Sequence, residues 1–443
     1  MTAFLITALW PGAGTADEDM CNTLICKMQT KDFSIDFRSL TYGIVQKYSD
    51  STQNPSNDFL QIPRYVAALE LRPDLRLNKD ILDLSVKPRM RVYYRKWQEG
   101  SREGDSDWDS DWFINEWLAR LKIRQNTFIS YGRENLQWGP SFLFSPSNPF
   151  FQDNGRRNPY LEVPGMDFGR VVYVPHSSWT ISLIANTGEG LNKATGPGRF
   201  LSSYPPAPFE KTYSLKIDYT GRESYSTAIL SRKEDSGNIL GFFGGWTVSD
   251  ALLLYSEGSF TQGSQALYPV TDNSTLRASM QKLYQYSSSI NPAILMGGSY
   301  TLETRGTLTI EYAYYGQGLN NTEADSYYSL RRKAAQAFIS DGPLSALGQK
   351  VLGQMTNTGL RLLRKNYGLF QYTQSNIKDV FDCTIRWTQN LDDGSGQFTS
   401  VLVYYLGKHL ELFSVGSIMA GGKNTEFGSM LDYQWMAGLK YTF

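Results

Sequence analysis

Apolar and polar residues alternate along many short segments of the chain, and the C-terminal stretch LDYQWMAGLKYTF shows the pattern most plainly. Read with a period of two, one face of this stretch carries Leu431, Tyr433, Trp435, Ala437, Leu439, Tyr441 and Phe443. A soluble edge strand rarely exposes such a row, because the row would template aggregation. A strand with lipid on its outer face and water on its inner face requires this pattern.

The same alternation recurs in segments close to the ~9–11 residues that a tilted transmembrane strand needs. We therefore predict an all-β fold, a transmembrane antiparallel β-barrel of about 18 strands, or about 16 if one weak pair such as 237–260 is not a pair of strands. The predicted strands are 33–47, 65–75, 81–97, 113–124, 126–135, 169–176, 178–187, 212–220, 223–233, 237–247, 250–260, 292–304, 306–316, 365–375, 378–390, 396–407, 409–420 and 430–443.

The lengths of the connections support this prediction independently. Connections after even-numbered strands are short, among them QN, GRE, SD and GKH. Most connections after odd-numbered strands are longer, such as 48–64, 136–168 and 317–364. Short periplasmic turns that alternate with long extracellular loops are typical of outer-membrane barrels, whereas a soluble sandwich has no reason to sort loops in this way.

One long connection has a helical rather than a strand-like pattern. Apolar residues recur at helical spacing over residues 329–364, and Asp341, Gly342 and Pro343 divide the segment in two. The sequence predicts a helical insertion that either caps the extracellular mouth or folds inward as a plug.

Composition narrows the class of protein. The 443 residues include 43 Lys and Arg against 43 Asp and Glu, so no net charge indicates a nucleic-acid partner. Aromatic residues make up 14%, which suits a membrane protein with aromatic belts at both interfaces. After the first ten residues, no apolar run reaches the ~18 residues that a spanning helix needs.

The N-terminal residues resemble an export signal. A short apolar run, Ala3 to Trp10, precedes Pro11 and small residues that end at Ala16, so residues 1–16 are predicted to be a signal peptide whose positive start lies upstream. Residues 17–32 then form a periplasmic segment, and 33–443 a single barrel. Cys21 and Cys26 could pair in an oxidising compartment. With only two histidines in the chain, no cofactor and no metal are expected.

The basic residues of the third to sixth strands share one face. Because a charge facing lipid at mid-depth costs about 2–4 kcal/mol, we expect these residues to line the lumen. They are Lys87, Arg89, Arg91, Arg95, Arg120, Lys122, Arg124, Arg133 and Arg170. Inward acidic residues are expected on later strands, at Asp218, Glu303, Glu311, Asp382, Glu411 and Asp432. Such a lumen either favours anions or other polar solutes, or is a ladder of charges that satisfy one another.

The connection at about 136–168 is too apolar for a solvated loop. Its side chains need a surface to pack on, which the inner wall of the barrel would supply. We expect it to fold inward as a constriction loop, and an external adhesive loop is the alternative. The candidate constriction residues are Trp138, Phe142, Phe144, Asn148 and Phe150.

The same region carries a resemblance to a known family. Its pattern G-R-x4-W-G-x6-P-S-N-P-F, followed by Gly-Met-Asp-Phe-Gly-Arg, resembles uncharacterised porin-like outer-membrane barrels with an early W-G…P-[ST]-[ND]…N-P signature. The matching positions are Gly132, Arg133, Trp138, Gly139, Pro146, Asn148, Pro149 and Arg170. The resemblance implies a porin-like barrel and is nearly silent on substrate. A fainter likeness links the segment to eighteen-stranded capsule-assembly barrels.

Two further groups of residues could carry chemistry. Asp105, Asp107, Asp109 and Asp111 occupy every second position and could collect Ca²⁺, but they lack the glycine and the terminal glutamate of an EF-hand loop, so an exposed acidic loop is favoured. A hydrolase would need a Ser–His pair, and His176 and His409 both fall in predicted periplasmic turns. We therefore predict that the protein is not an enzyme.

These observations favour a porin of the Gram-negative outer membrane that passes small polar or anionic solutes. Two alternatives stay open: a barrel sheath around a multihaem cytochrome, and a barrel that binds or exports surface polysaccharide. The expected partners are outer-membrane lipid and lipopolysaccharide, the solutes, and the barrel-assembly machinery, which would read Tyr441 and Phe443 as an assembly signal; a homo-oligomer is a further option. No nucleic-acid partner is expected.

Overall fold

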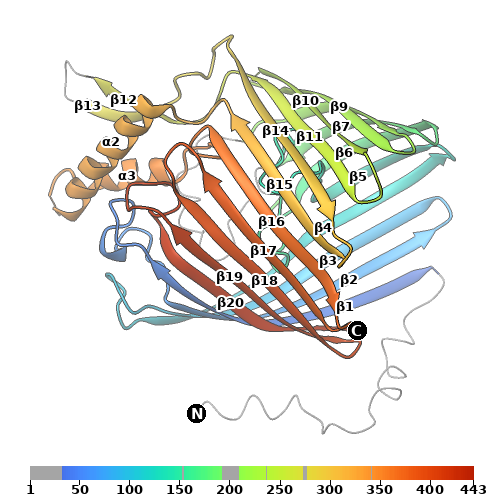
Figure 1. Cartoon of the computed structure of the whole chain (residues 1–443), viewed down its shortest axis with the longest axis horizontal. Coiled ribbons are helices and arrows are strands. Elements are labelled where there is room, and N and C mark those ends of the chain that lie inside the picture. The colour runs from blue at the N-terminus through green and yellow to red at the C-terminus, as the bar shows by residue number, and fades with distance from the viewer. Residues whose placement is uncertain (1–31, 152–153, 192–208, 236, 273–276, 341) are drawn as a thin grey trace, which may run out of the picture.

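The computed structural model describes residues 32–443, apart from 152–153, 192–208, 236, 273–276 and 341. In this part of the chain, eighteen antiparallel strands form one sheet, which closes because β20 (Leu431–Thr442) pairs with β1 (Phe33–Tyr48) (Figure 1). Closure leaves no sheet edge with unpaired backbone groups, as a bilayer requires. The predicted fold class and strand number are confirmed.

The strands between these two follow one another around the wall, each paired with its neighbours in sequence. They are β2 (Tyr65–Lys79), β3 (Leu82–Lys96), β4 (Ser106–Arg124), β5 (Thr127–Glu134), β6 (Met166–His176), β7 (Trp179–Gly188), β8 (Thr212–Thr220), β9 (Ser224–Lys233), β10 (Gly237–Thr247), β11 (Leu252–Gln262), β14 (Ile290–Thr301), β15 (Gly306–Tyr315), β16 (Asn366–Ile377), β17 (Phe381–Asn390), β18 (Gly396–Leu406) and β19 (Leu410–Ala420). The sequence placed the start of β4 at 113, too late, because Asp107 to Asp111 looked like a loop.

The two ends of the barrel differ as the loop lengths predict. The tight turns lie at the end that also holds the C-terminus, and the long connections lie at the opposite end (Figure 1). We call these the periplasmic and the extracellular end. Between β11 and β14, the extracellular connection forms a small hairpin, β12 (Tyr268–Asp272) and β13 (Arg277–Gln281), which the sequence analysis did not predict.

The outer face is built for lipid. Aliphatic side chains such as Leu183 and Leu230 are more than half exposed on it. Exposed tryptophans mark both rims, with Trp108 and Trp112 toward the extracellular end and Trp246 toward the periplasmic end. Such aromatic girdles flank the apolar band of a transmembrane barrel.

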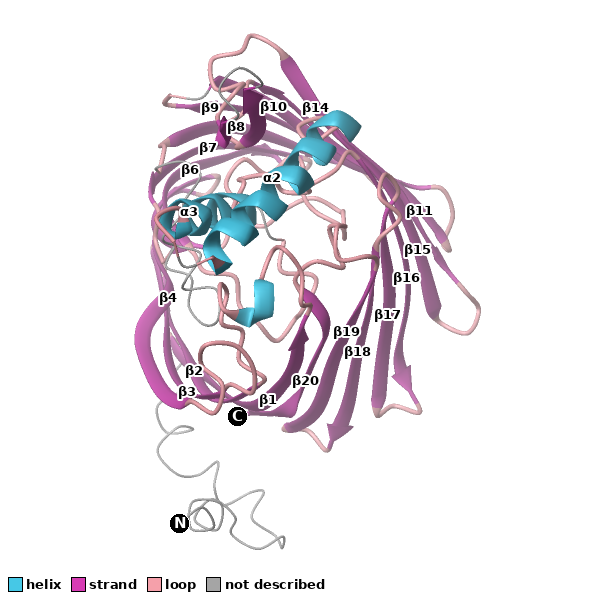
Figure 2. Ribbon diagram, turned by 90° about the vertical axis from the view of Figure 1, so that its left-hand side faces the viewer, coloured by secondary structure: helices cyan, strands magenta, loops and turns pink. Residues whose placement is uncertain are grey.

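The predicted helical insertion is present as two helices, α2 (Asn321–Ile339) and α3 (Ser345–Thr356), which lie across the extracellular mouth (Figure 2). The first helix begins earlier than the predicted residue 329 because Asn320 and Glu323 form a capping box, in which each side chain accepts a hydrogen bond from the other residue's backbone N–H. Neither helix in the described part of the chain is long and apolar enough to cross a bilayer.

The helices belong to a packed extracellular cap. Their apolar faces form one buried cluster with residues from the β1–β2 connection and from the β12–β13 hairpin, including Phe59, Tyr268, Tyr327, Leu352 and Met355. Arg331 of α2 ties the cap to the connection between β19 and β20 by donating to the carbonyl of Lys423 at 2.8 Å. The predicted signal peptide (1–16), the segment 17–31 and the Cys21–Cys26 pair lie outside the described residues.

Candidate functional site

Residues 135–151 and 154–165 of the connection between β5 and β6 lie inside the barrel, and we call this connection the inward loop. Loops fill much of the interior behind α2 and α3 (Figure 2). The inward loop contacts three separate parts of the inner wall: β6 and β7, then β11 to β16, and finally β1 to β3 with β19 and β20. It ends at 165 rather than at the predicted 168, because β6 begins at Met166.

Two buried glutamates hold the tip of the inward loop. The carboxylate of Glu257 on β11 accepts hydrogen bonds from the hydroxyls of Ser141 at 2.7 Å and Ser147 at 2.6 Å, and from that of Ser145. Glu311 on β15 accepts the backbone N–H groups of Phe142 at 2.7 Å and Leu143 at 2.8 Å. Carboxylates that accept several hydrogen bonds make strong anchors, so the tip is fixed against this wall.

Glycine is required where the inward loop passes Glu257. Gly139 has a φ of +86°, and a Cβ at this position would come within 2.2 Å of the Glu257 carboxylate. Any other residue would therefore be strained twice, by its backbone conformation and by the clash. This accounts for the glycine that follows Trp138 in the sequence.

The aromatic residues of the inward loop pack against the wall, as the sequence analysis expected. Phe150 lies edge-on to Phe168 of β6, with ring centroids 4.9 Å apart, and Trp138 packs on Phe150 at 5.7 Å. Phe144 packs on Tyr315 of β15 at 5.9 Å. Between Phe144 and Phe150, the side-chain amide of Asn148 donates a hydrogen bond to the carbonyl of Leu136, which stabilises the turn.

The last part of the inward loop is attached to the opposite wall. Tyr160 stacks on Phe413 of β19 with ring centroids 3.8 Å apart, and the carbonyl of Tyr160 accepts from Arg72 of β2 at 2.8 Å. Glu162 forms two hydrogen bonds with Arg89 of β3, at 2.6 and 2.8 Å. Burial would raise the pKa of Glu162, but the Arg89 hydrogen bonds and the nearby charge of Arg72 outweigh it and hold the pKa below its ordinary value.

Neighbouring carboxylates neutralise most of the nine basic residues that the sequence predicts to line the lumen, and we call these nine residues the basic ladder. Among the described residues, Lys122 and Arg124, both exposed near the periplasmic end, form no ion pair. The others pair as follows: Lys87 with Glu116, Arg89 with Asp74 and Glu162, Arg91 with Glu70, Arg95 with Asp107 and Asp109, Arg120 with Asp83, Arg133 with Asp167, and Arg170 with Glu134. Opposite charges thus alternate on one wall instead of facing each other across the lumen.

Arg133 is not a lumen residue. It shares a face of β5 with Ile129 and Tyr131, which point outward and are about half exposed. It pairs with Asp167 at the extracellular end of the wall, at 2.9 Å. A charge at this level lies beside the lipid headgroups, where it costs only ~0–1 kcal/mol, so the rule that charges point inward does not apply to it.

Arginines that the sequence analysis missed lie at the tip of the inward loop. Arg156 and Arg386 of β17 both approach the ring of Phe142, with guanidinium carbons 4.8 and 5.9 Å from its centroid. Arg156 donates to the carbonyls of Pro140 and Gly139, and Arg386 donates to Gln371. The charge of Arg386 is attracted by that of Glu311 and repelled by those of Arg156 and Arg157, so these four side chains lie near one another.

This group differs from the ladder in its charge balance. Among the described residues, none of Arg156, Arg157 and Arg386 forms an ion pair with a carboxylate, and Arg157 is exposed. Sequence patterns could not have found the group, because Arg156 and Arg157 lie in an irregular loop and meet Arg386 only in the folded barrel.

The aspartates weighed as a calcium site have other partners. Asp107 and Asp109 lie on β4, and their carboxylate oxygens form ion pairs with guanidinium nitrogens of Arg95 at 2.9 and 3.0 Å. Arg102 forms ion pairs with Asp105 and Asp107. Within the residues that the structure describes, no group of three or more acidic, histidine or cysteine side chains is arranged to hold a metal. The expected acidic loop is instead part of a strand whose aspartates face arginines.

The C-terminal residues close the barrel seam. The backbone N–H of Phe443 donates to the carbonyl of Phe37 at 3.0 Å, and the ring of Phe443 packs on Phe37 and Tyr441 with centroids 5.6 and 4.7 Å apart. The predicted assembly signal thus lies where the last strand meets the first.

Deleting Phe443 is therefore expected to lower the amount of folded barrel in outer-membrane fractions severalfold, because both the closing contact and the terminal aromatic are lost. The heat-modifiable folded form on gels measures this amount. Tyr219→Ala, which removes an outward aromatic from the periplasmic end of another strand, is the control. Unchanged levels after deletion of Phe443 would contradict the assembly role.

Comparisons with known proteins concern the fold. No family model and no curated protein matches the chain. The structure of OccK7 (OpdD) from Pseudomonas aeruginosa is 11% identical, covers 94% of this chain and 99% of its own, and has a TM-score of 0.53. OccAB3 from Acinetobacter baumannii is also 11% identical, with coverages of 94% and 100% and a TM-score of 0.52. The outer membrane protein OprD from Pseudomonas aeruginosa is 8% identical, with coverages of 93% and 94% and a TM-score of 0.54.

At such identities these likenesses show the fold alone. The closed barrel, its lipid-facing exterior and its similarity to outer-membrane proteins place this chain in the outer membrane of a Gram-negative bacterium, as the sequence predicted.

Proposed function

We propose that this protein is a porin in which the inward loop narrows the lumen, and that the group of Arg156, Arg157 and Arg386 favours small anionic or polar solutes there. The observation that carries the proposal is the contrast between these arginines and the ladder. Most ladder cations are compensated by a carboxylate within 3.4 Å, whereas this group has no such partner among the described residues. Glu311 is near enough to attract Arg386, but three cations against one carboxylate leave the group net positive. A net positive group in a narrow passage raises the local concentration of anions.

The attachment of the inward loop supports the first part of the proposal. A loop fixed to opposite walls by Glu257 and by Arg89 crosses the lumen and reduces its aperture. The same attachment argues against the alternative of a sheath around a multihaem cytochrome, since the inward loop crosses the space that such a partner would need. No contact among the described residues favours the polysaccharide-binding alternative.

The proposal predicts channels with anion preference. In planar bilayers under a KCl gradient, the purified barrel is expected to give stable conductance with a reversal potential on the anion-selective side. Arg157→Gln should reduce this preference, and the triple Arg156→Gln, Arg157→Gln, Arg386→Gln should remove most of it. Arg222→Gln, which neutralises an exposed arginine in the β8–β9 turn, is the matched control and should leave the reversal potential unchanged.

Two results would count against the proposal. A folded barrel that conducts no ions would contradict the porin function and favour the polysaccharide-binding alternative. Open channels whose selectivity is unaffected by the triple substitution would contradict the role of the arginines while leaving the porin function in place.

A further inference from the structure

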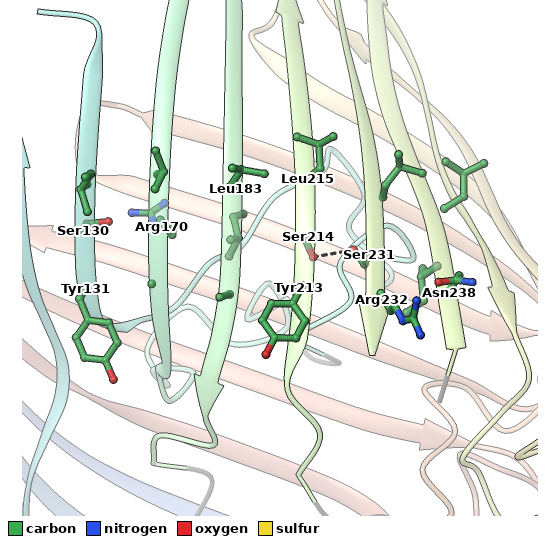
Figure 3. Close-up of a pocket in the computed structure, with 18 residues that line it drawn as sticks. Ser130, Tyr131, Arg170, Leu183, Tyr213, Ser214, Leu215, Ser231, Arg232 and Asn238 are labelled. Atoms are coloured by element: carbon green, nitrogen blue, oxygen red, sulfur yellow. Dashed lines mark hydrogen bonds between the residues drawn. The ribbon is translucent and has the colours of Figure 1, made fainter. Parts of the chain in front are cut away.

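A groove of about 810 Å³ runs along the outer face of the barrel over β5 to β10, away from the lumen (Figure 3). A cavity of this volume is large enough for a substantial ligand. Its lining is mostly apolar, and most of the large outward side chains that form it are exposed. The groove therefore opens toward the membrane, not toward the solute path.

Strand register arranges the outward lining in two rows, each with one residue from each strand. The deeper row is entirely aliphatic: Ile129, Val171, Leu183, Leu215, Leu230 and Leu240. The row nearer the extracellular end is mixed: Tyr131, Gly169, Ala185, Tyr213, Arg232 and Asn238. The groove is thus apolar toward mid-membrane and polar at its extracellular end.

The position of Arg232 fixes the depth of the second row. Its side chain points outward and is exposed, and at the bilayer centre this would cost about 2–4 kcal/mol. Tyrosines prefer the membrane interface, and Tyr213 is the direct cross-strand neighbour of Arg232. The hydroxyl of Tyr131 is 3.4 Å from that of Thr187, another outward residue at the same end. The second row therefore lies at the headgroup level of the outer leaflet.

Small residues give this row its hollow. Gly169 and Ala185 stand side by side between Tyr131 and Tyr213, and the tyrosine rings flank the gap (Figure 3). The hollow is not imposed by the backbone, because a Cβ on Gly169 would meet only Tyr131 at 3.7 Å, an ordinary contact. An alanine would therefore fit at this position, so the backbone does not require glycine there.

We infer that this groove binds an anionic lipid of the outer leaflet, a lipopolysaccharide, with a phosphate at Arg232 and acyl chains along the aliphatic row. Charge complementarity supports this occupant: among the described residues, the Arg232 guanidinium has no carboxylate partner. Asn238 and Tyr213, its cross-strand neighbours on either side, can add hydrogen bonds to the headgroup. The aliphatic row beneath matches hydrocarbon chains that enter from the same leaflet.

Native mass spectrometry of the full-length barrel, titrated with a purified short-chain lipopolysaccharide, tests the inference. Arg232→Gln should weaken binding roughly five- to tenfold, the effect of losing one charge-assisted hydrogen bond. Ala185→Phe, which fills the gap between the tyrosines, should also weaken it. Arg332→Gln, which removes an exposed arginine from α2 outside the groove, is the matched control and should bind like the wild type.

The outcomes separate the possible occupants. Equal binding by the wild type and Arg232→Gln would overturn the inference, and so would equal binding of a dephosphorylated lipopolysaccharide. A dimer that forms through this face without bound lipid would assign the groove to a second copy of the chain instead. Since the substituted residues lie outside the lumen, the conductance of these variants should stay unchanged. A failure of the lipid-binding inference is therefore distinguishable from a failure of the porin proposal.

Discussion

Replacing Arg89 with glutamine is expected to lower the free energy of unfolding of the barrel by about 3 kcal/mol, because the substitution leaves Glu162 without its ion-pair partner and leaves Asp74 with Arg38 alone. Arg89 has no exposed surface. Its guanidinium contacts Asp74 at 2.9 Å and Glu162 at 2.6 Å, and it donates to the carbonyls of Pro73 and Pro88. The inward loop should also detach near Glu162, since Arg89 is its main partner on this wall.

Unfolding in urea, followed by tryptophan fluorescence in detergent, measures the loss. The matched control is Arg120→Gln, which breaks the pair with Asp83 on the same wall. Because the Arg120 side chain is 45% exposed, that pair should contribute no more than about 1 kcal/mol. Equal losses for the two variants would show that burial does not set the strength of the ladder pairs.

Replacing Glu257 with alanine is expected to loosen the tip of the inward loop, which Glu311 alone then holds, and to raise single-channel conductance severalfold, with larger current fluctuations. The substitution removes the acceptor of the hydroxyls of Ser141, Ser145 and Ser147, and each buried donor left without a partner costs about 1–3 kcal/mol. The barrel itself should persist, because the backbone ladders of β10, β11 and β14 do not depend on this side chain.

Conductance in planar bilayers, compared at equal amounts of folded protein, checks this prediction. Glu257→Gln keeps one acceptor oxygen and should fall between alanine and the wild type. Glu303→Ala, in an exposed periplasmic turn, is the control for loss of a glutamate. If Glu257→Ala folds and conducts like the wild type, the inward loop does not limit the aperture.

The two substitutions act at opposite ends of one loop, which makes them informative together. Arg89 and Glu257 lie on different walls, and neither contacts the other's partners. Their effects on conductance should therefore add if the inward loop moves as two independent halves, and should be less than additive if releasing one end already frees the whole loop.

Much of the architecture could be predicted from the sequence because it depends on local pattern. A period of two assigns each residue of a strand to lipid or to lumen, so the strand number, the closing role of the last strand and the lining by Lys87, Arg91 and Arg120 follow from reading the chain. The apolar character of residues 136–168 likewise indicated a loop that packs inward. These predictions do not depend on which residues contact one another across the barrel.

Only the tertiary structure determines which residues pair across neighbouring strands and which parts of the wall the inward loop contacts. Alternation cannot say that Arg95 faces Asp107 or that Lys87 faces Glu116, because those pairs are set by the offset between neighbouring strands. It also cannot show that Arg133 lies at the level of the lipid headgroups, where an outward charge is tolerated.

The grouping of Arg156 and Arg157 with Arg386, and the anchoring of the inward loop by Glu257 and Glu311, join residues far apart in the sequence. Period-two alternation is a property of one strand at a time and determined the wall of this barrel. The charge balance and aperture of its lumen are properties of many strands and one loop together, and only the folded chain brings those parts into contact.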